Sequence, residues 1–76
     1  MTLVKQIIFE IEGLPNKVVS LYKLTDVWEI HESGSKIIVV TIGEAISRMK
    51  YKEIVNGYRA ALKSMDRGFK TVTIKE

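Results

Sequence analysis

The sequence predicts a small α+β domain, in which one long helix packs on an antiparallel, curved β-sheet of four to six strands. Two patterns support this prediction. Most of residues 1–50 alternate apolar and polar side chains with the period of two that half-buried strands show. Residues 51–66 instead repeat apolar side chains every three or four positions, as an amphipathic helix does. A length of 76 residues and an apolar fraction of 46% fit one domain with one core, residues 1–76.

The first strand is expected to end in a tight turn. In KQIIFEIEG, the side chains of Ile7, Phe9 and Ile11 fall on one face, and polar side chains fall on the other. GLPNK follows, and Pro15 and Asn16 suit the two central positions of a turn. A β-hairpin is therefore expected here.

The segment after this turn, residues 17–24, has two readings. VVSLYKL contains the β-branched and aromatic residues that favour a strand, which is the preferred reading. A short helix with Pro15 in its first turn is the alternative. The helix would change the order of elements to the ferredoxin-like βαββαβ arrangement. Both readings give an α+β fold.

Three further segments are expected to form strands. DVWEIHE places Trp28 and Ile30 on one face. KIIVVTI is apolar on both faces, as is typical of a central strand that is covered on both sides. FKTVTIKE closes the chain as an alternating strand, with Val72 and Ile74 expected to point inward.

The helix is expected to run from about Tyr51 to Asp66, with Gly68 as a left-handed cap after its end. The segment before it, residues 44–49, either forms a short strand or opens the helix. The alternation around Ile46 favours the strand. The preferred order is therefore β-β-β-β-(β)-α-β.

In outline, KLTDVWEI and KIIVVTI followed by a helix are similar to the LytTR type of DNA-binding domain. The same outline is similar to small phage modules and to SH3-like modules. The similarity is one of hydrophobic pattern, and it assigns no role to any residue.

Positive charge is concentrated in the second half of the chain. The net charge is +3, and residues 1–38 carry four Lys or Arg against five Asp or Glu, whereas residues 39–76 carry eight against four. A row of polar and mostly basic residues lies on the helix face expected to be opposite the apolar stripe: Lys52, Asn56, Arg59, Lys63 and Arg67. Like charges four residues apart destabilise a helix by roughly 0.2–0.5 kcal/mol. The row therefore indicates either an anion-binding surface or a solvated helix face.

The candidate nucleic-acid-binding residues lie on this row and at the entry to the helix. In RMKYK the basic residues interleave with Tyr51, which, with Tyr22, is the best candidate for an exposed aromatic residue that stacks on a base. Phosphate contacts of this kind position a nucleic acid without reading its sequence. The candidates are Arg48, Lys50, Lys52, Arg59, Lys63 and Arg67, with Lys70 as a further contact.

A strip of small residues, made of Gly57, Ala60, Ala61 and Ser64, lies beside the apolar stripe of the helix. Glycine in a helix interior costs about 1 kcal/mol of stability relative to alanine. The presence of Gly57 therefore indicates a role that requires a small residue. The strip either allows close packing on the protein's own sheet or forms a helix–helix contact in a homodimer.

The residue inventory argues against an enzyme, a metal site and a cofactor. There is no cysteine, and His31 is the only histidine of the chain. Catalysis would need a second group placed to cooperate with His31, and zinc would need three or four ligands. No apolar run is long enough to span a bilayer. The absence of cysteine and of a signal sequence favours a cytoplasmic protein.

These observations predict a non-enzymatic binding module that contacts nucleic-acid phosphates, or an acidic protein surface, through its basic helix face. The alternative is a small protein-interaction or inhibitor module, such as a regulator from a phage or mobile element. Such a module would use a sheet edge or the small-residue strip.

Overall fold

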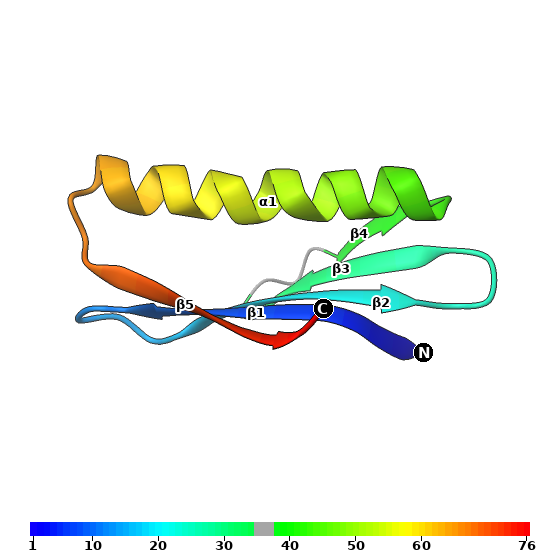
Figure 1. The fold of residues 1–76 in the computed structure, drawn as a ribbon, viewed down its shortest axis with the longest axis horizontal. Helices are drawn as coiled ribbons and strands as arrows, with labels where there is room; N and C mark the ends of the chain where they lie inside the picture. The colour runs from blue at the N-terminus through cyan, green and yellow to red at the C-terminus, as the bar shows by residue number, and fades with distance from the viewer. Residues whose placement is uncertain (35–37) are drawn as a thin grey trace.

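The structure, a computed structural model, describes residues 1–34 and 38–76. The strands form one antiparallel sheet in the order β4-β3-β2-β1-β5. The helix α1 lies along one face of this sheet (Figure 1). The predicted small α+β fold is therefore confirmed. The elements are β1 (Thr2–Ile11), β2 (Lys17–Lys23), β3 (Trp28–Glu32), β4 (Ile38–Thr41), α1 (Glu44–Ser64) and β5 (Phe69–Lys75).

The hairpin of β1 and β2 is formed as predicted. It shows which of the two structures predicted for residues 17–24, a strand or a short helix, is correct. β2 pairs antiparallel with β1, so that Val19 lies opposite Ile7 and Lys17 opposite Phe9. Gly13 turns the chain with a φ of 76°, a left-handed conformation that suits glycine. Because residues 17–23 form a strand, the ferredoxin-like alternative is wrong.

The core lies between α1 and the sheet face beneath it. Phe9 and Trp28 belong to it, as the alternation predicts, and Phe9 is fully buried. Tyr51 of the helix donates a hydrogen bond from its hydroxyl to the Val19 carbonyl oxygen at 2.7 Å. This bond satisfies the one polar atom that the ring carries into the core. The buried core residues are Phe9, Val19, Leu21, Trp28, Ile30, Tyr51, Val55 and Leu62.

The helix begins earlier than predicted, and residues 44–49 do not form a strand. Gly43, with a φ of 87°, precedes the first helical residue, Glu44, whose carboxylate suits the positive end of the helix dipole. Ser47 is fully buried and donates its hydroxyl hydrogen to the Gly43 carbonyl oxygen at 2.6 Å. The alternation at Ile46 misled the prediction because this side chain points to solvent from the helix.

The end of the helix was also placed incorrectly. Asp66, with a φ of 54°, takes the left-handed position that the sequence assigned to Gly68. The backbone N–H groups of Asp66 and Arg67 donate to the carbonyl oxygens of Lys63 and Leu62. These two bonds are those of a Schellman motif. Aspartate tolerates the left-handed region better than most residues, so the motif forms without glycine.

The two edge strands differ from the predictions in how their side chains are covered. β4 was expected to be a central strand, but it lies at an edge, and Ile38 and Val40 are exposed on the described part of that segment. In β5, Val72 and Ile74 were expected to point inward. Instead they are exposed, and Phe69 is the residue that packs against the core. The last residue of the SGS turn and the first two residues of KIIVVTI, residues 35–37, lie outside the described residues.

Candidate nucleic-acid interface

A basic groove runs between α1 and β1, on the flank of the helix that faces β5. Its volume is about 270 Å³. Three of its lining side chains are basic and none is acidic, although the chain as a whole carries nine acidic residues. The lining residues, here called the basic groove, are Lys5, Ile7, Tyr51, Lys52, Val55, Asn56 and Arg59.

Lys5 lies on the same face of β1 as Ile7 and Phe9, just after an irregularity in the strand. The pairing of β1 with β2 shifts between Leu3 and Lys5, and Lys5 then lies opposite Leu21, whose side chain belongs to the core. The Lys5 ammonium nitrogen lies 5.9 Å from the centre of the Tyr51 ring, which is within range of a cation–π contact. The ring thus supports Lys5 from within the groove.

Arg59 is held in place by packing rather than by an ion pair. Its guanidinium carbon lies 5.8 Å from the centre of the Phe9 ring, and the side chain is half-buried. A planar guanidinium on an aromatic face keeps its N–H donors free at its edges. Arg59 therefore presents a fixed positive charge on the flank of the helix, not on the opposite face that the sequence predicted.

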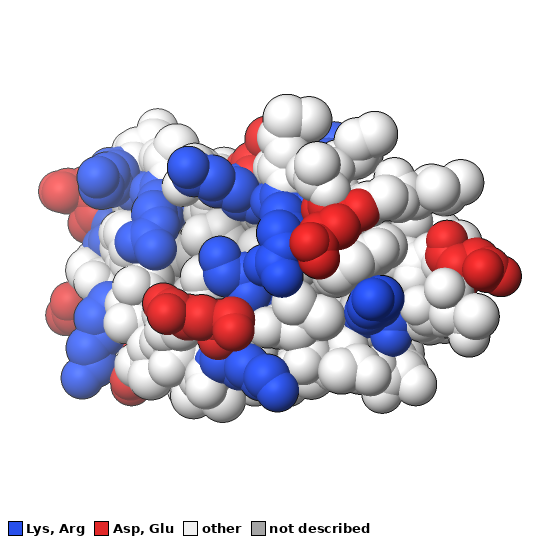
Figure 2. Space-filling view, turned by 45° about the vertical axis from the view of Figure 1, so that its right-hand side comes forward, with Lys and Arg blue, Asp and Glu red and all other residues white. Residues whose placement is uncertain are grey.

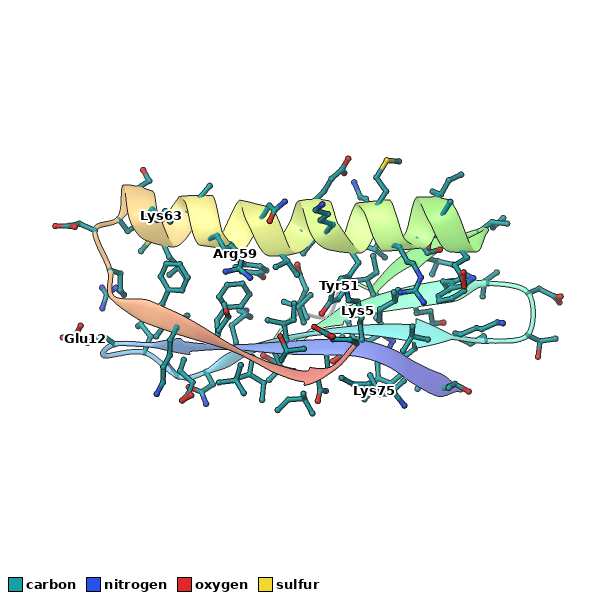
Figure 3. All side chains as sticks on the ribbon, viewed as in Figure 1. Lys5, Glu12, Tyr51, Arg59, Lys63 and Lys75 are labelled. Atoms are coloured by element: carbon teal, nitrogen blue, oxygen red, sulfur yellow. The ribbon has the colours of Figure 1, made fainter. Side chains whose placement is uncertain are left out.

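Lys52 and Lys63 are exposed and extend the charge along α1. Figure 3 shows Lys63 and Arg59 along the helix and Lys5 between the helix and the sheet. In Figure 2, Lys and Arg side chains gather over part of the face shown, with acidic side chains beside them. Within residues 1–34 and 38–76, the ion pairs of the structure involve other basic residues than these four.

Arg48 and Lys50, which the sequence placed in the same site, lie outside the groove. The Arg48 Nε atom lies 3.9 Å from a carboxylate oxygen of Glu44, and Lys50 Nζ lies 3.7 Å from one of Glu53. Exposed pairs of this kind contribute little stability. They do, however, place a negative charge beside each of these two cations, which weakens the local positive potential.

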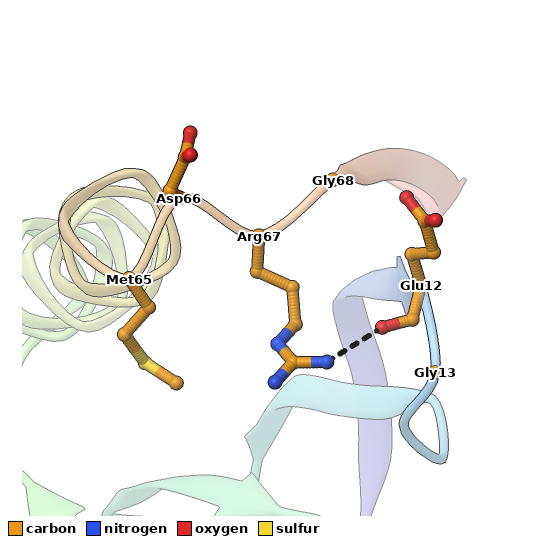
Figure 4. Close-up of a pocket in the computed structure, with 6 residues that line it drawn as sticks. All are labelled: Glu12, Gly13, Met65, Asp66, Arg67 and Gly68. Atoms are coloured by element: carbon orange, nitrogen blue, oxygen red, sulfur yellow. Dashed lines mark hydrogen bonds between the residues drawn. The ribbon is translucent and has the colours of Figure 1, made fainter.

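Arg67 connects two loops. It lies beyond the end of α1, and its Nη1 atom donates a hydrogen bond to the Glu12 carbonyl oxygen at 3.0 Å (Figure 4). The backbone N–H of Glu12 in turn donates to the Gly68 carbonyl oxygen at 2.9 Å. Arg67 thereby fastens the loop between α1 and β5 to the turn between β1 and β2, and the structure separates it from the basic groove.

Tyr51 was one of the two aromatic candidates for exposure, but only 1% of its surface is accessible. Burial raises the pKa of Tyr51 to about 12. The ring therefore forms part of the core and cannot stack on a base. The prediction of an exposed basic-aromatic patch at residues 48–52 is wrong for this reason.

The small-residue strip lies on the other side of α1. Gly57 and Ala61 border a shallow hollow of about 310 Å³ together with Glu32, Ile54 and Tyr58. Burial, followed by the neighbouring Glu32 carboxylate, raises the pKa of Tyr58. A Cβ atom added at Gly57 would meet nothing within 4 Å, and Ala60 and Ser64 are exposed. Close packing on the protein's own sheet therefore does not explain the strip.

His31 lies on the sheet face away from the helix. Its Nε2 atom is 2.9 Å from Oε1 of Glu29, and its ring meets the edge of Tyr22 at a centroid distance of 4.7 Å. No group of three or more His, Asp or Glu side chains in the described parts of the chain is arranged to hold a metal ion. Among the same residues, α1 is not apolar enough to cross a membrane.

Comparisons with known proteins add no assignment to this geometry. No family model matches the chain, and neither a curated protein nor a solved structure is significantly similar to it.

Lys5 is the groove residue that the sequence reasoning missed. The alternation that places Ile7 and Phe9 on one face of β1 also places Lys5 there, so the signal was present. What was absent from the sequence was the position of α1, which brings Lys52 and Arg59 beside that end of β1.

Proposed function

We propose that this protein is a non-enzymatic binding module whose basic groove takes the phosphate backbone of a nucleic acid. The observation that supports the proposal is the lining of the groove, where Lys5 from β1 meets Lys52 and Arg59 from α1 without an acidic side chain. Residues from two distant parts of the sequence thus supply charge of one sign to one cleft.

The groove favours an anion for two physical reasons. Walls of low dielectric constant concentrate the field of the charges between them, and Ile7 and Val55 provide such walls here. The aromatic contacts of Lys5 and Arg59 reduce the freedom of both side chains before a ligand binds. Contacts of this kind bind phosphates of any sequence, so the proposal includes no base readout.

The proposed contact residues differ from those suggested by the sequence. We retain Lys52, Arg59 and Lys63, and add Lys5. Arg48, Lys50 and Arg67 are left out because each has a partner elsewhere in the fold. A chain without cysteine suits a reducing compartment, so the proposal places the protein in the cytoplasm.

The test is the binding of a labelled single strand and a labelled duplex at about 50 and 200 mM salt. Three or four phosphate contacts on a duplex predict that affinity falls about 40- to 150-fold over this range, from a slope of about −0.9 for each contact. The variant K5E/K52E should abolish measurable binding at the higher salt concentration.

A charge-matched control is available within the chain. The variant K50E/K70E changes the net charge by the same amount, but both lysines lie outside the groove beside Glu53 and Glu10. It should retain most of the affinity. Equal loss in the two double variants would show that net charge alone attracts the ligand, and no binding at the lower salt concentration would contradict the proposed function.

A further inference from the structure

The basic groove is open towards β5. Its lining residues come from α1 and β1, and β5 lies directly beyond β1 at the edge of the sheet. α1 packs mainly on β2 and β3, so it stands over the middle of the sheet and leaves β5 uncovered on the same face. A ligand in the groove therefore has the helix on one side and the surface of β5 on the other.

Two threonines of β5 lie beside the groove. The strand register pairs Thr73 with Ile7 and Thr71 with Phe9. Residues that lie directly opposite each other in an antiparallel pair point to the same face, which here is the face under α1. Thr73 is exposed and Thr71 is half-buried. Threonine hydroxyls are among the groups that donate hydrogen bonds to phosphate oxygens, so β5 adds two such donors next to the cations of the groove.

The exposed cations of α1 lie on the flank that borders this surface. At about 100° per residue, Lys52, Arg59 and Lys63 fall within about 40° of one another around the helix. The contact of Arg59 with the Phe9 ring shows that this flank faces β1, and Figure 3 shows the Arg59 side chain between α1 and the sheet. Lys63 lies eleven positions after Lys52, which is about 16 Å along a helix. The charges thus form a straight row beside the groove.

The outward side of α1 carries no positive charge. Helical spacing places five exposed residues opposite the buried side chains of Tyr51 and Val55, and one of the five is acidic. A helix that enters the major groove of a duplex meets the nucleic acid with this outward side. α1 therefore lacks cations where a duplex laid over the helix would contact it. The five residues are Ile46, Met49, Glu53, Ala60 and Ser64.

We propose that the nucleic acid in the basic groove is a single strand, which lies along α1 between the helix and the two threonines of β5. This inference rests on the proposed function, because it names the form of nucleic acid that the same groove takes. Lys5 and Arg59 are half-buried beside the sheet, whereas Lys52 and Lys63 are exposed. A thin, flexible strand reaches all four cations, but a duplex that stays above the helix reaches only the two exposed ones.

The floor of the groove suits the bases of a single strand. Grooves that bind single strands combine cations that follow the backbone with surfaces on which bases rest. Ile7 and Val55 provide apolar surface, and the guanidinium plane of Arg59 belongs to the groups on which bases stack. Bases are free to make such contacts in a single strand, whereas in a duplex they are stacked inside the helix. The inference includes no preference for one base over another.

The test compares the salt dependence of two labelled probes, an oligothymidine and a duplex of the same length. Four phosphate contacts on the single strand predict a slope of log affinity against log salt of about −2.8, at about −0.7 for each contact. Two contacts on the duplex predict about −1.8, at about −0.9 for each contact. The oligothymidine should also bind more tightly at about 50 mM salt.

The order of the two slopes decides the question. If both probes used the same contacts, the duplex would have the steeper slope, because each duplex contact releases more counterions. A duplex slope as steep as that of the oligothymidine would overturn the inference and leave the proposed function standing. The absence of binding by either probe at about 50 mM salt would contradict the proposed function and this inference together.

Two matched variants test the path of the strand. Thr73→Glu and Ala60→Glu each add one negative charge at an exposed position, the first beside the groove and the second on the outward side of α1. Thr73→Glu should weaken oligothymidine binding about fivefold, which is the effect of one like charge at contact distance in water. Ala60→Glu should weaken it less than about twofold, because its charge lies across the helix, about one screening length away.

The opposite substitution distinguishes a lost contact from a damaged fold. Thr73→Lys should strengthen oligothymidine binding and steepen its salt slope by about 0.7, because it adds one phosphate contact. Ala60→Lys should leave the slope unchanged. Circular dichroism should match the wild type in all four variants, since both positions are exposed. Stronger effects at Ala60 than at Thr73 would place the nucleic acid on the outward side of α1 and overturn the inference.

Discussion

The two faces of the sheet are built from the same strands, yet their apolar side chains are buried to different extents. On the face under α1, Phe9, Val19 and Leu21 are completely buried. On the other face, Val40 and Ile74 stay more than half exposed. Because side chains alternate along each strand, both faces come from one sequence pattern, and a single helix can cover only one of them. The apolar pattern therefore gives the sheet two faces with apolar side chains. The position of the helix determines which of the two faces becomes the core.

The largest difference between the faces is expected in unfolding free energy. Leu21→Ala should destabilise the protein by about 2–5 kcal/mol, because it removes buried methyl groups and leaves a cavity. Val40→Ala should cost less than about 1 kcal/mol, since the side chain is already hydrated in the single chain. Urea unfolding at a concentration where the protein is monomeric compares them. Similar losses would show that the open face is buried even in the monomer.

Tyr51 offers a second test of the face under the helix. Tyr51→Phe should cost about 1–2 kcal/mol at neutral pH, because the Val19 carbonyl oxygen loses its hydroxyl donor. Burial raises the pKa of Tyr51 in the folded protein to about 12, above its usual value of 10. The folded state therefore favours the protonated Tyr51 hydroxyl. This contribution to the unfolding free energy is complete below about pH 10 and is lost as the pH rises towards 12.

The pH dependence of unfolding tests this role of Tyr51. The wild type should lose about 2–3 kcal/mol between pH 10 and 12 through Tyr51, and Tyr51→Phe should lose less over that range. An unchanged alkaline slope in Tyr51→Phe would mean that another group is responsible.

The helix also has one side that packs on the sheet and one side that does not. The smallest expected change in unfolding free energy comes from substitutions on the side that does not. Gly57→Ala should stabilise the monomer by about 0.5–1 kcal/mol, because alanine restricts the unfolded chain and its Cβ would meet nothing within 4 Å. Ala60→Gly, one turn away on the exposed surface, should destabilise by a similar amount. A loss in Gly57→Ala, seen in thermal unfolding, would indicate that another backbone approaches the helix there.

Much of the fold was predictable because it depends on local chemistry. Alternation identified β1 and β3, and β-branched and aromatic residues identified β2. Turn residues identified the hairpin, and helical spacing identified most of α1. Phe9 and Trp28 were assigned to the core for the same reason. Each of these features follows from residues close in sequence, whose side-chain directions are set by backbone geometry.

The errors arose where side-chain contacts between different elements determine the structure. The start of α1 depends on the buried hydroxyl of Ser47, which contacts Thr41 on β4 at 2.6 Å. Arg67 looked like part of a basic row, but its partner is Glu12, fifty-five positions away. Neither contact produces a periodic pattern in the sequence. The pattern therefore predicted a strand before the helix, and it predicted a phosphate contact after the helix.

By itself, the sequence determined the strands, the hairpin, the existence of one amphipathic helix and an excess of positive charge in the second half of the chain. Only the tertiary structure decided that the helix lies beside β1, so that Lys5 joins Lys52 and Arg59 in one groove. It also decided that the edges at Ile38 and Ile74 stay open. The reason is that periodicity fixes where side chains point along one element, whereas charge and burial depend on which elements meet.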